Sequence, residues 1–498
     1  MKKYEPWLTG AAVALLCALS AWRRFRFLDS SPYPMGIDGY FYADQLRSIL
    51  EHGHLNWPAP PLAFWLMAPF AALTDPIVGA KLGAAILGAL GGVPAFLLGK
   101  RLGGSRAAGL AACAILTASA GSFYLSVEFV KQGVGVTIAL AALCVIAKTL
   151  ERPSRAWIAA SAACVLATWL THKSAAGMVV VVALPAIAIE LRARELLVRA
   201  ANAAGGAHAL VVIAGLVFPD RFLALGDLRL VAGLFGERAR WELPAIDFGD
   251  HALWIGHEAL CGAIAVAALA AVTIVTPRPQ AIVIRPSSRE RAFTYAFAAL
   301  AIVIAIPWLD VVDPQGLGFR LRLIAFVPFA LVAAAALGAI AELIPMREAR
   351  WLPALAALGW LAVQPPARDE GVVRAHPALV AAVRALDGTV PSGDMIVTTE
   401  RHIQFMTVYY TRIPTALDPA LVPRAHRWRL MPLAFIGSGS PLDHALLDAR
   451  RALDVPPPRG VHPRNPNGLV LVAEPTWEWV LDHLPPKTRA WAKAWHTI

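Results

Sequence analysis

The first polar stretch between two long apolar runs reads Gly36-Ile37-Asp38-Gly39-Tyr40-Phe41-Tyr42-Ala43-Asp44-Gln45-Leu46-Arg47. It places one carboxylate, Asp38, between two glycines and just beyond an apolar run that can enter a membrane. A partly desolvated carboxylate at such a boundary can act as a general base. An aspartate directly before a helix can equally cap the first backbone N–H groups of that helix. This stretch alone leaves both roles of Asp38 open.

The composition around this stretch indicates a polytopic membrane protein. Hydrophobic residues make up 57% of the 498 residues and charged residues only 16%, compared with about a quarter in an average soluble protein. The net charge is +11, but the basic residues are scattered between apolar runs and form no continuous stripe with aromatic residues. We therefore expect no nucleic-acid partner. The sequence contains no CxxC motif or Cys/His cluster, so it does not predict a zinc site.

Runs of roughly 15 to 25 apolar residues predict about eleven membrane-spanning helices. We expect them near residues 8–22, 77–98, 106–121, 133–149, 156–170, 174–190, 201–218, 252–276, 292–308, 323–344 and 351–364. The first run can also be read as a cleaved signal peptide. We favour a retained helix, because many spans follow and Trp22 with Arg23, Arg24 and Arg26 would anchor the helix at the membrane interface.

The charges between the predicted spans define two sides. Short loops on one side carry Lys and Arg, whereas the loops on the other side carry most carboxylates. The positive-inside rule then predicts a multi-pass protein of the cytoplasmic (inner) membrane with a cytoplasmic N-terminus. With an odd number of spans, the C-terminal tail lies on the outer side, as does Asp38. The first outer loop, residues 23–76, is expected to hold two surface helices, at 38–52 and 61–73; the second can instead span the membrane.

The composition changes near residue 365. Residues 365–498 have spaced prolines, mixed charge and no apolar run long enough to span a membrane. We expect helices at 377–387, 401–410 and 441–453, strands at 394–398 and 468–472, and a last helix with Trp477, Trp479, Trp491 and Trp495. The predicted fold class is mostly α: a transmembrane helical bundle, residues 1–364, followed by a small extracytoplasmic α/β domain, residues 365–498.

Two further outer loops combine charged side chains with very short connections. Glu128 and Lys131 lie within one helical turn after the third predicted span, and His172 and Lys173 lie between the fifth and the sixth. Such groups can surround a reacting centre at the membrane boundary. An ordinary surface ion pair would also explain Glu128 and Lys131, and a lysine that reaches toward the headgroups would explain Lys173.

Arg320 and Arg322 stand directly before the tenth predicted span, on the outer side, where the charge rule disfavours cations. A guanidinium binds phosphate through two parallel hydrogen bonds, so a lipid phosphate would explain both residues. General headgroup anchoring explains them nearly as well. His257 and Glu258 lie inside the eighth predicted span, where ionisable groups usually face the interior of the bundle, and we expect them in supporting roles.

In their order and sidedness, these features resemble the GT-C glycosyltransferases, a class that includes oligosaccharyltransferase catalytic subunits, protein O-mannosyltransferases and the aminoarabinose transferases of lipid A. The likeness covers roughly residues 1–364 and is strongest over 36–104. The matching segments are Ile37-Asp38-Gly39-Tyr40-Phe41-Tyr42, Pro60-Pro61-Leu62, Gly99-Lys100-Arg101-Leu102-Gly103-Gly104, Glu128, Thr171-His172, and Arg320 and Arg322 before Pro328. Gly39 stands where several members have Glu, and the second outer loop has no Asp-x-Asp, so a divalent metal is without support.

The resemblance implies that Asp38 is catalytic and that the donor is a sugar on a polyprenyl phosphate. The expected reaction is the transfer, with inversion, of a hexose or pentose to an acceptor glycan, lipid or protein on the outer face of the membrane. Membrane lipids and the lipid-linked donor are then the partners, and no further cofactor is expected. The candidate substrate-binding residues are Tyr40, Tyr42, Glu128, Lys131, His172, Lys173, Arg320 and Arg322.

Two other classes of function remain open at this point. A transporter or lipid flippase is expected to show inverted repeats and paired broken helices near the middle of the membrane, and neither is visible in the sequence. A non-catalytic assembly or anchoring protein would use residues 365–498 as its working part. Convergence of Asp38 with the other outer groups would favour the enzyme.

Overall fold

The computed structural model describes residues 5–191, 213, 252–275, 288–305, 323–344, 346, 351–363, 375–398, 401–417, 421–432, 469–473, 482 and 486. The chain forms two compact units. One, which we call the helical unit, comprises Met1–Ser30 and Ile49–Gly371. The other, the C-terminal unit, comprises Ser31–Ser48 and Val372–Ile498. The C-terminal unit therefore includes the stretch that contains Asp38.

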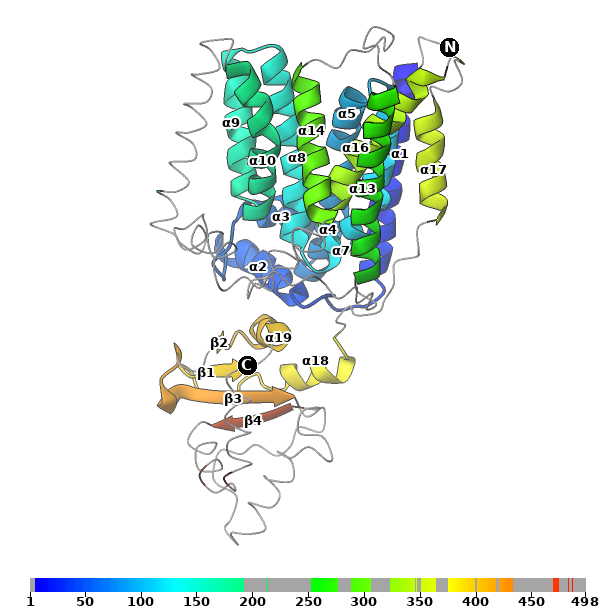
Figure 1. The fold of residues 1–498 in the computed structure, drawn as a ribbon. Coiled ribbons are helices and arrows are strands. Elements are labelled where there is room, and N and C mark those ends of the chain that lie inside the picture. Colours follow the sequence, from blue (N-terminus) through cyan, green and yellow to red (C-terminus); the bar gives the residue numbers. More distant parts are fainter. Residues whose placement is uncertain are drawn as a thin grey trace. The chain divides into compact units, whose positions relative to one another are not determined.

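The helical unit consists of apolar helices, many of which run alongside one another (Figure 1). They are α1 (Glu5–Leu28), α3 (Leu62–Leu73), α4 (Pro76–Ala89), α5 (Gly92–Leu102), α6 (Arg106–Ala118), α7 (Ala120–Val127), α8 (Val130–Glu151), α9 (Arg155–Trp169), α10 (Lys173–Leu191), α13 (Ala252–Val275), α14 (Ser288–Ala305), α16 (Phe326–Leu343) and α17 (Leu352–Val363). A helix occupies each predicted span except 201–218, which lies outside the described residues apart from Ile213.

Several of these helices can cross a bilayer. Among the described residues, the stretches that are long and apolar enough to span a membrane are α1, Pro76–Leu102 (α4 together with α5), α8 and α16. The bent pair of α6 and α7 is also long and apolar enough if it is taken as one span. The chain is a multi-pass membrane protein. The total of about eleven spans stays a prediction, and so does the choice between a surface helix and a span for residues 61–73.

The helices differ from the predicted spans in three places. Helix α1 continues to Leu28, beyond the predicted end at Trp22. The predicted helix 77–98 is interrupted between α4 and α5. The predicted helix 106–121 ends at Ala118, and α7 leaves it at an angle of 44°. Ser119 lies at this bend and accepts a hydrogen bond from the backbone N–H of Ser122 at 3.3 Å, as expected of a side chain that starts a new helix.

Small residues allow the helices of this unit to approach closely. A Cβ atom at Gly338 of α16 would lie 2.2 Å from the backbone oxygen of Gly103, and one at Gly99 would lie 2.4 Å from the Cβ of Ala112. Glycine and alanine at such crossings let backbones pack directly, which is how helices associate when lipid removes the hydrophobic driving force. The core of the unit is one cluster of buried residues from several helices, whose first member in the sequence is Ala95 in α5 and whose last is Ala335 in α16.

The C-terminal unit combines helices with a four-stranded sheet (Figure 1). Its elements are α2 (Gly39–His52), whose residues up to Ser48 belong to it, α18 (Pro377–Arg384), β1 (Met395–Thr398), α19 (Arg401–Thr411), β2 (Thr415–Ala416), the 3-10 helix η4 (Arg424–His426), β3 (Arg427–Pro432) and β4 (Leu469–Ala473). The strand order is β2-β1-β3-β4, with β1 parallel to both neighbours and β3 antiparallel to β4.

The elements of this unit agree in part with those expected from the sequence. Helices α18 and α19 and strands β1 and β4 lie at predicted positions, whereas β2 and β3 were not predicted. The predicted helix 441–453 and the last helix with its four tryptophans lie outside the described residues. The predicted division of the chain at residues 364/365 stays a prediction; the structure groups Ser31–Ser48 with the later part of the chain.

Candidate functional site

Asp38 occupies the residue directly before α2, and local geometry fixes it there. Gly36 has φ of 83°, a left-handed conformation that glycine adopts without strain. A Cβ at Gly39 would lie 2.9 Å from the Cβ of Pro34, so only glycine fits at the start of the helix. The backbone N–H of Tyr42 donates to the carbonyl of Asp38 at 3.2 Å. The half-buried Asp38 therefore has the backbone position of a helix cap, where negative charge is stabilised.

Tyr40 and Tyr42 follow Asp38 and are both buried. The Tyr40 hydroxyl lies 3.2 Å from that of Tyr410, and its burial raises the pKa of Tyr40 above the ordinary value. The ring of Tyr42 contacts that of Phe41, with centroids 5.5 Å apart. These contacts are typical of packing residues, and a role in substrate binding stays a prediction for both.

Glu128 and Lys131 flank the junction of α7 and α8. Glu128 is buried and ends α7, where its backbone N–H donates to the carbonyl of Tyr124 at 2.9 Å. Lys131 lies in the first turn of α8, with Nζ 5.8 Å from the ring centroid of Phe64 in α3. A cation over an aromatic face is held by the charge distribution of the ring. The junction thus presents one acidic and one basic group beside the start of α3.

His172 and Lys173 lie at the same end of the helical unit. A Cβ at Gly135, one turn along α8 from Lys131, would lie 2.9 Å from the Cβ of His172, so the α9–α10 connection packs directly on α8. The His172 Nδ1 atom is 2.8 Å from the Ser174 hydroxyl. The backbone N–H of Leu62, which begins α3, donates at 3.0 Å to the carbonyl of Leu170, the residue directly after α9.

Glu128, Lys131, His172 and Lys173 come from two segments that lie at one end of the helical unit. Their membership of one site stays a prediction. Asp38, Tyr40 and Tyr42 belong to the C-terminal unit. Arg320 and Arg322 lie outside the described residues.

Comparisons with known proteins bear on both the sequence and the fold. A family model described as dolichyl-phosphate-mannose-protein mannosyltransferase matches residues 58–218 of the 498. No curated protein sequence matches the chain significantly. Among solved structures, the chain is similar to the archaeal oligosaccharyltransferase AglB from Archaeoglobus fulgidus, in complex with an inhibitory peptide and a dolichol-phosphate. The TM-score is 0.53 at 11% identity, covering 87% of this chain and 70% of that one.

The chain shares the fold of this oligosaccharyltransferase. ArnT from Cupriavidus metallidurans is also similar, at 16% identity with a TM-score of 0.43. The apo structure aligns over 95% of this chain and 99% of that chain, and the structure bound to undecaprenyl phosphate over 93% and 98%. The expected resemblance to this class is confirmed at the level of the fold.

Within the helical unit, Glu258 holds the beginning of α7. The sequence suggests a supporting role for this residue, and the structure shows the hydrogen bonds that it makes. The carboxylate, 2% exposed, accepts hydrogen bonds from the Ser119 hydroxyl and, at 3.2 Å, from the backbone N–H of Gly121. Negative charge at a helix N-terminus is favourable. The side chain of its neighbour His257 lies outside the described residues.

Arg24 holds the side of the same helix, and sequence reasoning missed this role. Its guanidinium is 2% exposed and donates to the hydroxyls of Ser126 at 2.5 Å, Ser122 at 2.7 Å and Ser20 at 3.2 Å. From the sequence, Arg24 was expected to be part of an interfacial anchor. The signal that could have revealed its contacts is the spacing of Ser122 and Ser126, which lie on one face of a helix. Glu258 and Arg24 together fix the helix that ends at Glu128.

The described part of the chain contains no set of side chains that could bind a metal ion. No three His, Cys, Asp or Glu side chains come together there. We assign no metal site to these residues.

His402, on α19, is a buried histidine, and we expect it to make the C-terminal unit sensitive to acid. The side chain is 7% exposed and its ring centroid lies 5.7 Å from that of Tyr40. Burial lowers the pKa of His402 to about 4, from 6.5. Between these two pH values the unfolded chain binds the proton and the folded chain does not. The free energy of unfolding therefore decreases as the pH falls from about 6.5 toward 4.

We expect the thermal midpoint of the wild type to fall more steeply over this range than that of His402→Phe. The difference corresponds to up to about 3 kcal/mol at the acid end, from roughly two pKa units at 1.36 kcal/mol each. Scanning fluorimetry in detergent at stepped pH measures it. Parallel pH profiles for the two proteins would refute the assignment.

Proposed function

We propose that the chain is an integral membrane glycosyltransferase that moves a sugar from a polyprenyl-phosphate carrier to an acceptor on the outer face of the membrane. The observation that carries this proposal is a coincidence of two likenesses. The family match to dolichyl-phosphate-mannose-protein mannosyltransferase covers residues 58–218, and the fold likeness to an oligosaccharyltransferase bound to dolichol-phosphate covers 87% of the chain. Both the family and the oligosaccharyltransferase complex involve a polyprenyl phosphate.

In the proposed reaction, Asp38 is the general base. It takes the proton from the acceptor hydroxyl or amide as the acceptor atom bonds to the anomeric carbon of the sugar. The bond between that carbon and the phosphate oxygen breaks, and the electron pair leaves with the polyprenyl phosphate. Because this is a single displacement, it inverts the anomeric centre. The place of Asp38 at a helix N-terminus suits an ionised carboxylate, which is the form that a base requires.

The leaving phosphate needs cations, and we assign them to the outer groups. Lys131 and Lys173 supply positive charge at one end of the helical unit, and Arg320 or Arg322 add guanidinium groups. Preorganised cations at developing charge can each contribute on the order of 3 kcal/mol. Glu128 and His172, from the same end of the unit, contact the sugar or the acceptor in this proposal, and Tyr40 and Tyr42 support the segment that carries the base.

The proposed orientation follows from the loops. The N-terminus lies in the cytoplasm, because the short loops on that side are basic, and the acceptor is reached from the outside. The C-terminal unit lies outside the cytoplasmic membrane and shapes access of the acceptor. The acceptor is a glycan, a lipid or a protein.

Native mass spectrometry of the purified chain tests whether it holds the carrier. We expect a polyprenyl phosphate to co-purify, and we expect Lys131→Met to lower its occupancy about tenfold, because one lost charge-assisted contact to phosphate is worth at least about 1.4 kcal/mol. Lys148→Met is the matched control: it removes a lysine from the other end of α8, where Nζ pairs with Glu151 at 3.0 Å. That pair contributes only about 0.2–0.5 kcal/mol.

Equal loss of lipid in the two variants would remove Lys131 from the site. Recovery of phospholipids alone, without any polyprenyl phosphate, would count against the proposed donor.

A further inference from the structure

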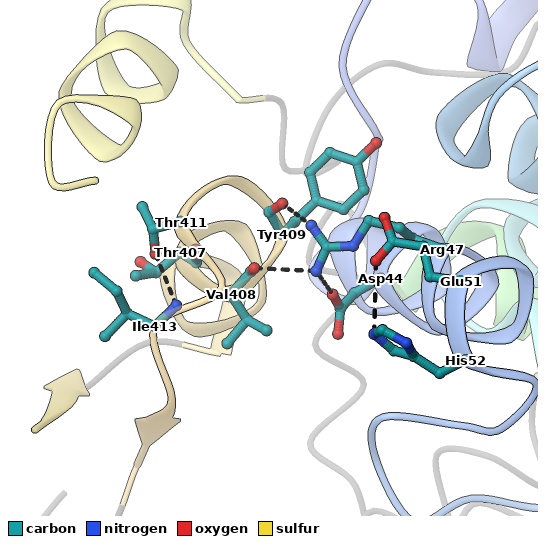
Figure 2. A network of polar contacts seen from close by, with 9 residues as sticks. All are labelled: Asp44, Arg47, Glu51, His52, Thr407, Val408, Tyr409, Thr411 and Ile413. Atoms are coloured by element: carbon teal, nitrogen blue, oxygen red, sulfur yellow. Dashed lines mark hydrogen bonds and ion pairs between the residues drawn. The ribbon is translucent and has the colours of Figure 1, made fainter. Parts of the chain in front are cut away.

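Arg47 makes a set of contacts that ordinary surface arginines lack (Figure 2). Its guanidinium donates to the backbone carbonyls of Tyr409 and, at 3.2 Å, of Val408 in α19. It also donates to the carboxylate of Asp44, one turn earlier in α2, at 2.6 Å. The same guanidinium lies 5.0 Å from the ring centroid of Tyr409. One side chain of α2 thus contacts both the backbone and an aromatic ring of α19.

The two carbonyls belong to the last turn of α19, which ends at Thr411. Carbonyls of a last turn form the negative end of the helix dipole, and most of them lack a partner within their own helix. The residue after the helix, Arg412, has φ of 58°, the left-handed conformation in which many helices end. Its backbone N–H donates to the Val408 carbonyl at 3.0 Å, so that carbonyl is shared between Arg412 and Arg47. Arg47 therefore caps α19, although it lies 361 positions before Val408 in the chain.

Asp44 stabilises this capping arrangement in a buried place. Its side chain is fully buried, and that of Arg47 is 16% exposed. A buried guanidinium is stabilised when a carboxylate and hydrogen-bond acceptors surround it, and it is costly otherwise. The Asp44 carboxylate supplies the charge and α19 supplies the acceptors. Removal of either partner leaves the other buried and incompletely paired.

The contact continues toward Asp38. Tyr40, Asp44 and Arg47 recur at helical spacing on one face of α2. At the start of that face, Tyr40 contacts Tyr410 and His402, and the ring centroid of Phe41 lies 5.0 Å from that of Phe405. Asp38 precedes the first of these docked residues by two positions. The docked face of α2 therefore sets where the segment of Asp38 lies within the C-terminal unit.

We infer that Arg47, neutralised by Asp44, is a positioning residue for Asp38, and that the last turn of α19 anchors it. The contact between Arg47 and α19 follows from their hydrogen bonds. Its importance for catalysis rests on the proposed function. Arg47 touches no substrate in this proposal. It acts by fixing the helix that begins at the base.

The test compares three variants of the full-length protein in detergent. Arg47→Met removes the donors and keeps most of the apolar stem. Arg47→Lys keeps the charge but not the planar fork, so it can reach one carbonyl instead of two. Arg401→Met is the matched control, because Arg401 is an exposed arginine at the other end of α19, and a cation at a helix N-terminus is not stabilised by the dipole.

The first measurement is hydrogen–deuterium exchange, which does not depend on any activity. We expect Arg47→Met to speed exchange about tenfold or more at residues 36–48 and 408–413, since one lost charge-assisted hydrogen bond shifts a local opening equilibrium by at least that factor. Arg47→Lys gives an intermediate change and Arg401→Met gives none. Unchanged exchange at residues 36–42 in Arg47→Met overturns the inference. If Arg47→Met also loses protection in β1 and β3, Arg47→Lys decides by the same criterion.

The second measurement is turnover of dolichyl-phosphate mannose, the donor named in the description of the matching family. A positioning role predicts that kcat falls about tenfold or more in Arg47→Met while KM for the lipid donor stays unchanged, with partial recovery in Arg47→Lys. If Arg47 had a purely structural role, its substitution would lower the amount of folded protein and leave kcat and KM of the folded fraction unchanged. Faster exchange together with unchanged kcat overturns the positioning role alone. If the folded wild type turns over no polyprenyl-phosphate-linked donor, the proposed function fails, and the exchange result still decides the contact.

Discussion

Asp38→Asn is expected to transfer sugar about 10²–10⁴-fold more slowly than the wild type, which is the usual contribution of a general base. Asparagine keeps the shape of the side chain and can still cap α2, so the helix should form as before. What it lacks is a group that accepts the proton of the acceptor. The rate of polyprenyl phosphate release from a sugar-loaded donor, at matched amounts of purified protein, measures the loss.

The control for this substitution is Asp75→Asn. Asp75 is also an aspartate before a helix, and its carboxylate accepts from the backbone N–H groups of Ile77 at 2.8 Å and Val78 at 2.9 Å. It is exposed and belongs to no proposed site. We expect full activity for Asp75→Asn. An undiminished rate for Asp38→Asn would return Asp38 to the role of a structural cap.

Gly338→Val is expected to destabilise the helical unit by about 3 kcal/mol or more, the upper end for an overpacked core. The obstacle is backbone: a Cβ at Gly338 would meet the carbonyl oxygen of Gly103 at 2.2 Å and its Cα at 2.8 Å. A side chain could rotate away, but a backbone at a helix crossing cannot. The thermal midpoint and the monodisperse fraction in detergent report the loss.

Gly177→Val separates this clash from the intrinsic effect of valine. Gly177 lies within α10, and a Cβ added to it would have nothing within 4 Å. Both substitutions carry the same helix-propensity change, which for Gly to Val is small. Similar midpoints for the two variants would mean that α16 and the turn at Gly103 do not meet as described.

The sequence predicts the helical bundle because the signal is local. Runs such as 133–149 are apolar over the thickness of a bilayer, and a bilayer leaves a single chain segment little choice but a helix. The match of α8 (Val130–Glu151) to that run follows from this constraint. Helix breaks are less visible. The bend at Ser119 depends on Glu258, which lies 139 residues further along the chain.

The residues of the candidate site also differ in how far the sequence predicts them. The sidedness of Lys131 and His172 follows from charge and span counting, and the structure brings them to one end of the helical unit. Burial of Arg24 among serine hydroxyls depends on a partner helix about a hundred residues away. Its charge alone suggested the membrane interface instead.

The role of Arg47 shows the same limit. The helical spacing of Tyr40, Asp44 and Arg47 is visible in the sequence, and it indicates a face that packs on something. The partner, the last turn of α19, cannot be found from that pattern, because nothing local to α2 specifies it. The strand β3 is a different case: Arg427, Trp428, Arg429 and Leu430 alternate as a strand does, and the two arginines obscured an available signal.

The most direct test of the proposed activity is turnover of a panel of dolichyl- and undecaprenyl-phosphate-linked hexoses and pentoses by the purified full-length chain, with a membrane extract as the source of acceptors. We predict release of free polyprenyl phosphate from at least one donor, with the sugar recovered on an acceptor, and loss of both products in Asp38→Asn. Consumption of none of these donors by protein that is folded and monodisperse would contradict the claim that the chain is a polyprenyl-phosphate-dependent glycosyltransferase.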